Sequence, residues 1–242
     1  MFYDLRKQAE AMIAASPGGG TRFFDVANFA WTKKLEAAWP AMRAELDRLL
    51  TVLDRLPCYE KIERGAERQS DGRWKMFPLY IHGHDFGGSE RRCPATCEAL
   101  KNIPGLKVAS FSILQAGKAL TPHRGPYSGV LRYQLALKVP QAQTQCGIFV
   151  GGEQAHWREG KSMIFDDSHV HYAWNHSEED RAVLFVDFVR PLSTELAEFN
   201  AKVISVLGQH EMVTDAVRNW RAWESKYGQS LDQAMADVAR RA

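Results

Sequence analysis

The sequence lacks the features that mark several classes of protein, and each absence removes one class. Four cysteines in 242 residues are too few for a disulfide scaffold. No apolar run approaches the ~20 residues that a membrane-spanning helix needs. The first residues, M-F-Y-D, soon give way to polar ones, without the charged start and long apolar stretch of a signal peptide. These absences predict a cytoplasmic protein with reduced thiols and no transmembrane segment.

An excess of charge of one sign is also missing. Lys and Arg total 31 and Asp and Glu total 29, which leaves a net charge of +2. This balance excludes the basic profile of a nucleic-acid-binding protein. Cys93 and Cys97 lie close together, but no second pair completes a structural zinc site. With 45% hydrophobic and 25% charged residues, the composition is that of an ordinary globular protein.

Hydrophobic periodicity indicates helices at both ends of the chain and strands in its centre. Apolar residues three and four apart predict helices at 4–15, at 32–56 and after residue 191, and a shorter helix is expected at 95–101. From residue 106 onward, the period changes to two. The expected strands are 74–81, 106–114, 130–139, 146–150, 162–165 and 182–189.

Short strands separated by glycine turns favour an antiparallel barrel or sandwich. We therefore expect a mainly β fold, a double-stranded β-helix or cupin-like jelly roll, flanked by N- and C-terminal helices. The whole chain is expected to form one domain. Its expected parts are a helical and loop-rich segment at 1–105, the jelly-roll core at 106–191 and a helical extension at 192–242.

Two histidines lie in unusual settings for such a fold. His123 follows Thr-Pro and stands shortly before an expected strand, and His171 ends the polar stretch D-D-S-H-V-H between two expected strands. An antiparallel jelly roll can bring such positions together at one mouth, where two imidazoles could bind a metal. A lone histidine is more often a surface or hydrogen-bonded residue, so this interpretation depends on the surroundings of the pair.

Two arginines lie on the expected strands. By alternation Arg132 shares a face with Gln134, and Arg181 shares a face with Asp187. A buried arginine is costly unless an anion meets it. One alternative is a structural ion pair with Asp187 or Asp166. The other is bidentate capture of a ligand carboxylate, which the planar guanidinium group matches in shape.

Two blocks of sequence carry a specific resemblance. Residues 123–135 read H-R-G-P-Y-S-G-V-L-R-Y-Q-L, and residues 165–191 read F-D-D-S-H-V-H-Y-A-W-N-H-S-E-E-D-R-A-V-L-F-V-D-F-V-R-P. Together they resemble the signature blocks of the aspartyl/asparaginyl β-hydroxylase family, which also includes bacterial lipid A acyl-chain hydroxylases. The likeness runs from Gly72 to Pro191, about half of the chain.

The resemblance implies an activity, its cofactors and the residues of the site. It implies a dioxygenase that uses Fe(II), 2-oxoglutarate and O2 to hydroxylate an unactivated C–H, with release of succinate and CO2. His123 and His171 match the iron ligands, and with Arg181 they are the expected catalytic residues. Arg181 and Ser112 match the residues that hold the carboxylate of 2-oxoglutarate away from the metal. The positions matched to 2-oxoglutarate binding are Trp74, Ser112, Arg132, Gln134 and Arg181.

Two positions depart from the usual patterns. Gln134 stands where the family usually has a histidine, and glutamine can donate a hydrogen bond but cannot carry positive charge. Gly125 stands where most iron oxygenases of this kind place a carboxylate ligand. The sequence therefore predicts a two-histidine metal site with water or an external anion in the third place. Asp167 or Asp187 would orient that water.

The substrate remains open among three classes. An amino acid, a peptidyl Asp or Asn and a lipid acyl chain all fit the resemblance, which leaves the oligomeric state open too. A missing carboxylate also makes room for chloride in iron halogenases, so halogenation is one alternative activity. A non-catalytic cupin-like protein that binds a small carboxylate or a metal is another. Iron-dependent decarboxylation of 2-oxoglutarate would distinguish an enzyme from this last alternative.

Overall fold

The computed structural model describes residues 2–63, 71–140 and 143–241. The α-helices are α1 (Phe2–Ala15), α2 (Thr32–Leu50), α3 (Gly87–Arg92), α4 (Pro94–Leu100), α5 (Thr194–Gly208) and α6 (Glu211–Arg241). Short 3-10 helices are η1 (Val26–Asn28), η2 (Leu53–Arg55), η3 (Tyr59–Lys61) and η5 (Gln143–Gln145). The strands are β1 (Phe23–Phe24), β2 (Trp74–Ile81), β3 (His84–Asp85), β4 (Leu106–Leu114), β5 (Val130–Lys138), β6 (Cys146–Val150), β7 (Glu153–Ala155), β8 (Ser162–Phe165), β9 (His171–Asn175) and β10 (Arg181–Val189).

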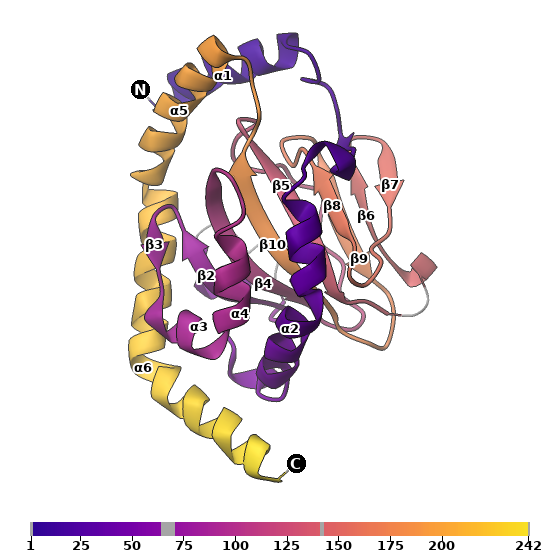
Figure 1. The fold of residues 1–242 in the computed structure, drawn as a ribbon, viewed down its shortest axis with the longest axis vertical. Coiled ribbons are helices and arrows are strands. Elements are labelled where there is room, and N and C mark those ends of the chain that lie inside the picture. Colours follow the sequence, from indigo (N-terminus) through magenta and orange to yellow (C-terminus); the bar gives the residue numbers. More distant parts are fainter. Residues whose placement is uncertain (1, 64–70, 141–142, 242) are drawn as a thin grey trace.

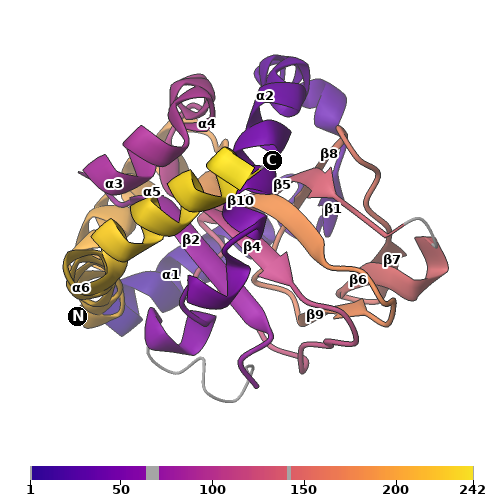
Figure 2. The same ribbon diagram turned by 90° about the horizontal axis from the view of Figure 1, so that it is seen from below.

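The strands form two antiparallel sheets. A seven-stranded sheet has the order β1-β8-β5-β10-β4-β2-β3, and a three-stranded sheet has the order β7-β6-β9. Figures 1 and 2 show the small sheet on one side of the molecule and helices α3, α4 and α6 on the other. Strands β1 to β5 all belong to the large sheet, and from β6 onward the chain passes between the two sheets, with β6, β7 and β9 in the small sheet and β8 and β10 in the large one. The expected fold, a jelly roll flanked by terminal helices, is confirmed.

Strand register decides which side chains point between the two sheets. Arg132 of β5 lies opposite Asp187 of β10, and Gln134 lies opposite Phe185. On the other side of β10, Ser112 of β4 lies opposite Val183. Because alternate residues of a strand share a face, these residues and Arg181 all line one surface of the large sheet. The faces expected for the two arginines are confirmed.

Helices cover the opposite surface of the large sheet. Phe77 of β2 stacks on Phe111 of β4 with ring centroids 6.4 Å apart, and Trp220 of α6 meets Phe77 edge-on at 5.4 Å. Trp39 of α2 donates a hydrogen bond from its indole nitrogen to the carbonyl oxygen of Ala136, 2.9 Å away. This packing leaves the other surface of the sheet to line the interior of the jelly roll.

Most of the expected elements are present at the expected residues. The strands expected at 74–81, 106–114, 146–150 and 162–165 match β2, β4, β6 and β8 from end to end. The helix expected at 32–56 ends at Leu50 and is followed by the short η2. Strand β9 was not expected. Its inward positions include the polar His171 and Asn175, which hide the usual alternation of apolar and polar residues.

Two further expectations concern the thiols and membrane segments. Each of the four cysteines is a free thiol, as expected. Burial raises the pKa of Cys97 to about 11 and that of Cys93 further, so both are protonated at neutral pH. Within the described ranges, no helix combines the length and apolar character needed to cross a bilayer.

Candidate active site

His123 and His171 lie side by side at the mouth of the jelly roll. Their backbones form a bridge in which the His123 amide donates to the His171 carbonyl at 3.0 Å and the reverse bond is 2.8 Å. The two ring centroids are 4.2 Å apart. Residues distant in the sequence are thus held as neighbours by β-type pairing. The same pairing selects His171 rather than the nearby His169 as the partner of His123.

Both rings are oriented by backbone carbonyl groups. The Nδ1 of His123 lies 2.8 Å from the carbonyl oxygen of Thr121, and the Nδ1 of His171 lies 3.0 Å from that of His169. A carbonyl only accepts, so each Nδ1 carries the proton and each Nε2 keeps its lone pair. Burial lowers the pKa of His123, and it lowers the pKa of His171 to about 3. Two neutral imidazoles with free Nε2 atoms fit a metal ion.

Gly125 and Asp167 occupy the place where a third ligand would be expected. The Gly125 amide donates to the Asp167 carbonyl at 2.8 Å. A Cβ added to Gly125 would lie 2.0 Å from Oδ2 of Asp167, so the Asp167 carboxylate fills the space of a side chain there. Burial raises the pKa of Asp167, and the Arg132 guanidinium opposes this shift. Among the residues described, no cluster of three or more His, Cys, Asp or Glu is arranged to hold a metal.

Arg181 is a buried cation with unsatisfied nitrogen atoms. Its side chain lies over the indole of Trp157, with the guanidinium carbon 4.6 Å from the ring centroid. The Nε and Nη1 atoms are buried and have no hydrogen-bond partner among the described residues. Burial lowers the pKa of Arg181 to about 10. The ion pair with Asp187 that the sequence allowed is not formed, and the two free N–H groups fit a ligand carboxylate.

Ser112 and Trp74 lie next to Arg181 on the same surface. Ser112 is opposite Val183, and Arg181 is two residues from Val183 on the same face of β10. Ser112 and Arg181 are therefore diagonal neighbours on adjacent strands, a separation that a long side chain such as arginine can span. The Trp74 indole donates to the Ser112 hydroxyl oxygen at 3.0 Å, so the serine proton is available for another acceptor. The structure thus brings together three of the residues matched to 2-oxoglutarate.

Gln134 reaches Arg181 indirectly, through Trp157. The Trp157 indole nitrogen donates to Oε1 of Gln134 at 2.8 Å. Trp157 is almost completely buried, so its N–H group needs this acceptor. At this position, where a histidine is usual, Gln134 therefore holds the ring on which the Arg181 guanidinium lies.

Arg132 is fully engaged with carboxylates. Its Nε donates to Oδ1 of Asp187 at 2.8 Å, and its Nη2 lies 3.0 Å from Oδ2 of the same residue and 2.8 Å from Oδ2 of Asp167. Its guanidinium carbon is 4.0 Å from the centroid of Phe185. Burial opposes the charge, but the two carboxylates outweigh it and raise the pKa of Arg132. Of the two alternatives for the arginines, the geometry of Arg132 fits the ion pair.

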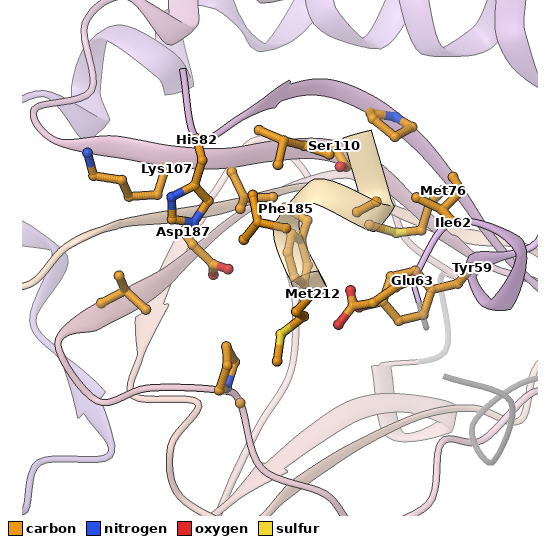
Figure 3. Close-up of a pocket in the computed structure, with 18 of the residues that line it drawn as sticks. Tyr59, Ile62, Glu63, Met76, His82, Lys107, Ser110, Phe185, Asp187 and Met212 are labelled. Carbon is orange, nitrogen blue, oxygen red and sulfur yellow. The ribbon is translucent and has the colours of Figure 1, made fainter. Parts of the chain in front are cut away.

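A cavity of about 300 Å3 adjoins His123 between the large sheet and the junction of α5 with α6. Figure 3 shows Phe185 and Met212 near its middle, His82, Lys107 and Asp187 towards one end, and Tyr59, Ile62, Glu63 and Met76 towards the other. Most of the lining is apolar. The apolar and aromatic lining residues are Tyr59, Ile62, Trp74, Met76, Pro78, Ile81, Val108, Pro126, Val130, Phe185, Leu207, Met212, Val213 and Ala216.

Comparison with known proteins identifies the family. The sequence profile described as Aspartyl/Asparaginyl beta-hydroxylase matches residues 36–191, a range that contains His123, His171 and Arg181. This chain belongs to the aspartyl/asparaginyl β-hydroxylase family.

Relatives in the aspartyl/asparaginyl β-hydroxylase family differ in length and in the substrates that their names state. "Ornithine lipid ester-linked acyl 2-hydroxylase" from Rhizobium tropici is 40% identical over 210 residues, covering 86% of this chain and 75% of that protein. Human "Aspartyl/asparaginyl beta-hydroxylase" is 32% identical over 164 residues, covering 66% of this chain and 21% of that protein. Among solved structures, a Cupin_2 domain from Enterobacter cloacae aligns at 13% identity with a TM-score of 0.34, covering 49% of this chain and 99% of that domain.

Several residues of this site were not given a role in it from the sequence. Trp157 and Cys146 contact Arg181, and His82 lies at one end of the cavity. Trp157 lies in the stretch Trp-Arg-Glu-Gly outside the predicted strands, and Cys146 begins one of them. Cys146 shares a face of β6 with Val150, the residue opposite His171, but this pairing with β9 emerges only from the structure. His82 carried no signal.

Proposed function

We propose that this chain is an Fe(II)- and 2-oxoglutarate-dependent dioxygenase that hydroxylates an unactivated C–H bond. The observation that carries the proposal is the pairing of two neutral imidazoles with a buried, unsatisfied Arg181 inside the same jelly roll. A buried guanidinium without an anion is costly. A dicarboxylate bound at the metal by one end and at Arg181 by the other would remove that cost, and 2-oxoglutarate has this shape.

Each side chain of the site has a definite part in this proposal. His123 and His171 would hold iron through Nε2, while Thr121 and His169 fix their tautomers. Bound iron would supply the oxidising power for hydroxylation, with 2-oxoglutarate and O2 consumed and succinate and CO2 released. The chain's own residues would bind and orient 2-oxoglutarate and the substrate, and they would exclude bulk water from the site. Asp167 is placed to accept a hydrogen bond from a water at the position that Gly125 leaves without a ligand.

The cavity favours an acyl chain as the substrate. Its lining beside His123 is mostly apolar, which suits a hydrocarbon chain better than the charged side chain of a peptidyl aspartate. The rhizobial relative named as an acyl 2-hydroxylase is also more similar to this chain than the human relative, at 40% against 32% identity. We therefore propose an acyl chain of a polar lipid as the substrate.

Halogenation is disfavoured by the surroundings of Gly125. The space beside this glycine holds the Asp167 carboxylate, and a chloride placed there would lie next to another anion. A purely carboxylate-binding protein is a weaker alternative as well, because it would not need two neutral imidazoles with free Nε2 atoms. Iron-dependent turnover separates the carboxylate-binding protein from the hydroxylase. The mass of the product, with a gain of oxygen rather than of chlorine, separates the halogenase.

The proposal is tested by two measurements on the purified chain. With Fe(II), 2-oxoglutarate and O2 present, we expect succinate to form, and to form faster with a lipid that carries a long acyl chain. Mass spectrometry should show that this lipid has gained one oxygen atom. A peptide that contains aspartate and free amino acids serve as parallel substrates. Absence of iron-dependent succinate, together with no oxygen gain in any substrate, would overturn the proposed function.

A further inference from the structure

His82 has a strained backbone at the edge of the cavity. Residues His82 and Gly83 connect β2 to β3, and Ile81 pairs with His84 across the turn. The φ angles are 43° for His82 and 91° for Gly83, as in the type I′ turns of two-residue hairpins. His82 is the sole non-glycine residue with positive φ among the residues placed by the structure. Asn or Gly would fit this position at lower cost.

The position of the His82 imidazole gives a reason for this strained backbone. The residue lines the cavity that also contains His123. A Cβ added to Gly208, at the end of α5, would lie 3.2 Å from Nδ1 of His82, so the missing side chain at Gly208 leaves room for the ring. Burial lowers the pKa of His82 to about 4, which keeps the ring neutral and able to donate one hydrogen bond.

Lys107 places a positive charge at the same end of the cavity. The His82 amide donates to the Lys107 carbonyl oxygen at 2.6 Å, which fixes the two residues together. Within the described chain, no carboxylate lies within ion-pair distance of the Lys107 ammonium group. The neighbouring Asp187 is already bound by Arg132 through two hydrogen bonds. Figure 3 shows His82 and Lys107 near each other, with Asp187 below His82.

We propose that His82 and Lys107 form a recognition site for an anionic oxygen group on the substrate. A neutral N–H donor beside a free ammonium group suits a carboxylate or a phosphate. The apolar part of the cavity would hold the hydrocarbon of the same molecule. This inference rests on the proposed function, because it assumes that the cavity beside His123 is the substrate site. It narrows the substrate to an amphiphile with a negatively charged head.

Binding of small amphiphiles to the metal-free full chain tests this site. The ligands are N-dodecanoylglycine with a carboxylate, dodecyl phosphate, and dodecanol as the neutral compound with the same chain length. Isothermal titration measures their dissociation constants. We expect at least one anionic ligand to bind the wild type on the order of tenfold more tightly than dodecanol. Tighter binding of the carboxylate or of the phosphate ligand shows which of the two anionic groups the site recognises.

Two kinds of variant assign that preference to the proposed residues. His82→Gly removes the imidazole and His82→Asn keeps a turn-forming residue, so neither should lower the thermal unfolding midpoint. Lys107→Gln removes the charge. All three should weaken the anionic ligand several-fold and leave dodecanol unchanged. The matched controls are His84→Asn, on the next strand and outside the cavity lining, and Lys101→Gln, an exposed lysine paired with Glu98. Neither should alter binding of either ligand.

Two results would overturn the site. The first is an anionic ligand that binds the His82 variants and Lys107→Gln as tightly as the wild type. The second is a wild type that binds dodecanol as tightly as both anionic ligands. Neither result bears on the proposed hydroxylase activity, which is judged separately from succinate formation and oxygen gain. Conversely, a chain that selects anionic amphiphiles but forms no succinate would keep this site and refute the dioxygenase.

Discussion

The Asp167 carboxylate occupies the space in which a side chain on Gly125 would lie. A Cβ added to Gly125 would be 2.0 Å from Oδ2 and 2.4 Å from Oδ1 of Asp167. Asp167 is buried and bound by Arg132, so it cannot simply move aside. The glycine at this position is therefore coupled to an aspartate distant in the sequence.

This coupling predicts the effect of a single methyl group. Gly125→Ala should lower the free energy of unfolding by about 1–3 kcal/mol, because the methyl group collides with Asp167 rather than because of backbone strain. Chemical denaturation measures the change. In the Asp167→Ala background, the same substitution should cost clearly less. Equal costs in both backgrounds would show that the two residues are not in conflict.

Arg181 and Ser112 should contribute unequally to binding of 2-oxoglutarate. Arg181→Ala should weaken binding roughly 10- to 100-fold through loss of charge-assisted hydrogen bonds, while Ser112→Ala should weaken it only several-fold. Arg181→Lys should recover part of the loss, since an ammonium group cannot form the bidentate pair. Titration with Fe(II) under nitrogen gives the dissociation constants. An Arg181→Ala protein with wild-type affinity would contradict the assignment.

The two buried arginines should affect stability in opposite directions. Without co-substrate, Arg181 is an uncompensated buried cation, so Arg181→Met should raise the free energy of unfolding by about 1 kcal/mol or more. Arg132→Met should lower it by roughly 3–5 kcal/mol, because Asp167 and Asp187 would lose their cation. Urea denaturation of both metal-free variants provides the comparison. Destabilisation of the same size in both would mean that Arg181 has a structural partner.

Gln134 should act on the co-substrate through Trp157. Gln134→Leu leaves the buried indole N–H without an acceptor, at a cost of about 1–3 kcal/mol, and frees the ring beneath Arg181. We expect weaker 2-oxoglutarate binding and a shift in tryptophan fluorescence. Gln134→His keeps an acceptor nitrogen and should restore much of both properties. Weaker binding in Gln134→Leu without any fluorescence change would argue for direct contact between Gln134 and the co-substrate.

Metal binding should tolerate mild acid. A metal competes with protons for imidazole. Burial lowers the pKa of both His123 and His171, that of His171 to about 3, so protons compete less in mild acid than they would for ordinary imidazoles. The affinity of the metal-free protein for Co(II), an O2-stable substitute for Fe(II), should therefore fall less than tenfold between about pH 7.5 and about pH 6. A tenfold loss over this range would indicate imidazoles with ordinary pKa values.

The sequence by itself determined the six longest strands apart from β9, the faces of β5 and β10, and the main candidates of the site. Alternation with a period of two is a local property, so it placed Arg132 with Gln134 and Arg181 with Asp187 on common faces before any contact was known. The motifs around His123 and His171 identified the histidine pair through resemblance to the family, whose profile matches 36–191.

Only the tertiary structure decided which of these residues meet. The register between β5 and β10 sets Arg132 against Asp187, and the loop before β9 adds Asp167. Arg181 is left without a carboxylate partner in the part of the chain that the structure describes. The cavity likewise forms where η3, the β2–β3 turn and the α5–α6 junction meet the large sheet. Strand register and packing depend on contacts between distant segments of the chain. The hydrophobic pattern of a single segment does not specify those contacts.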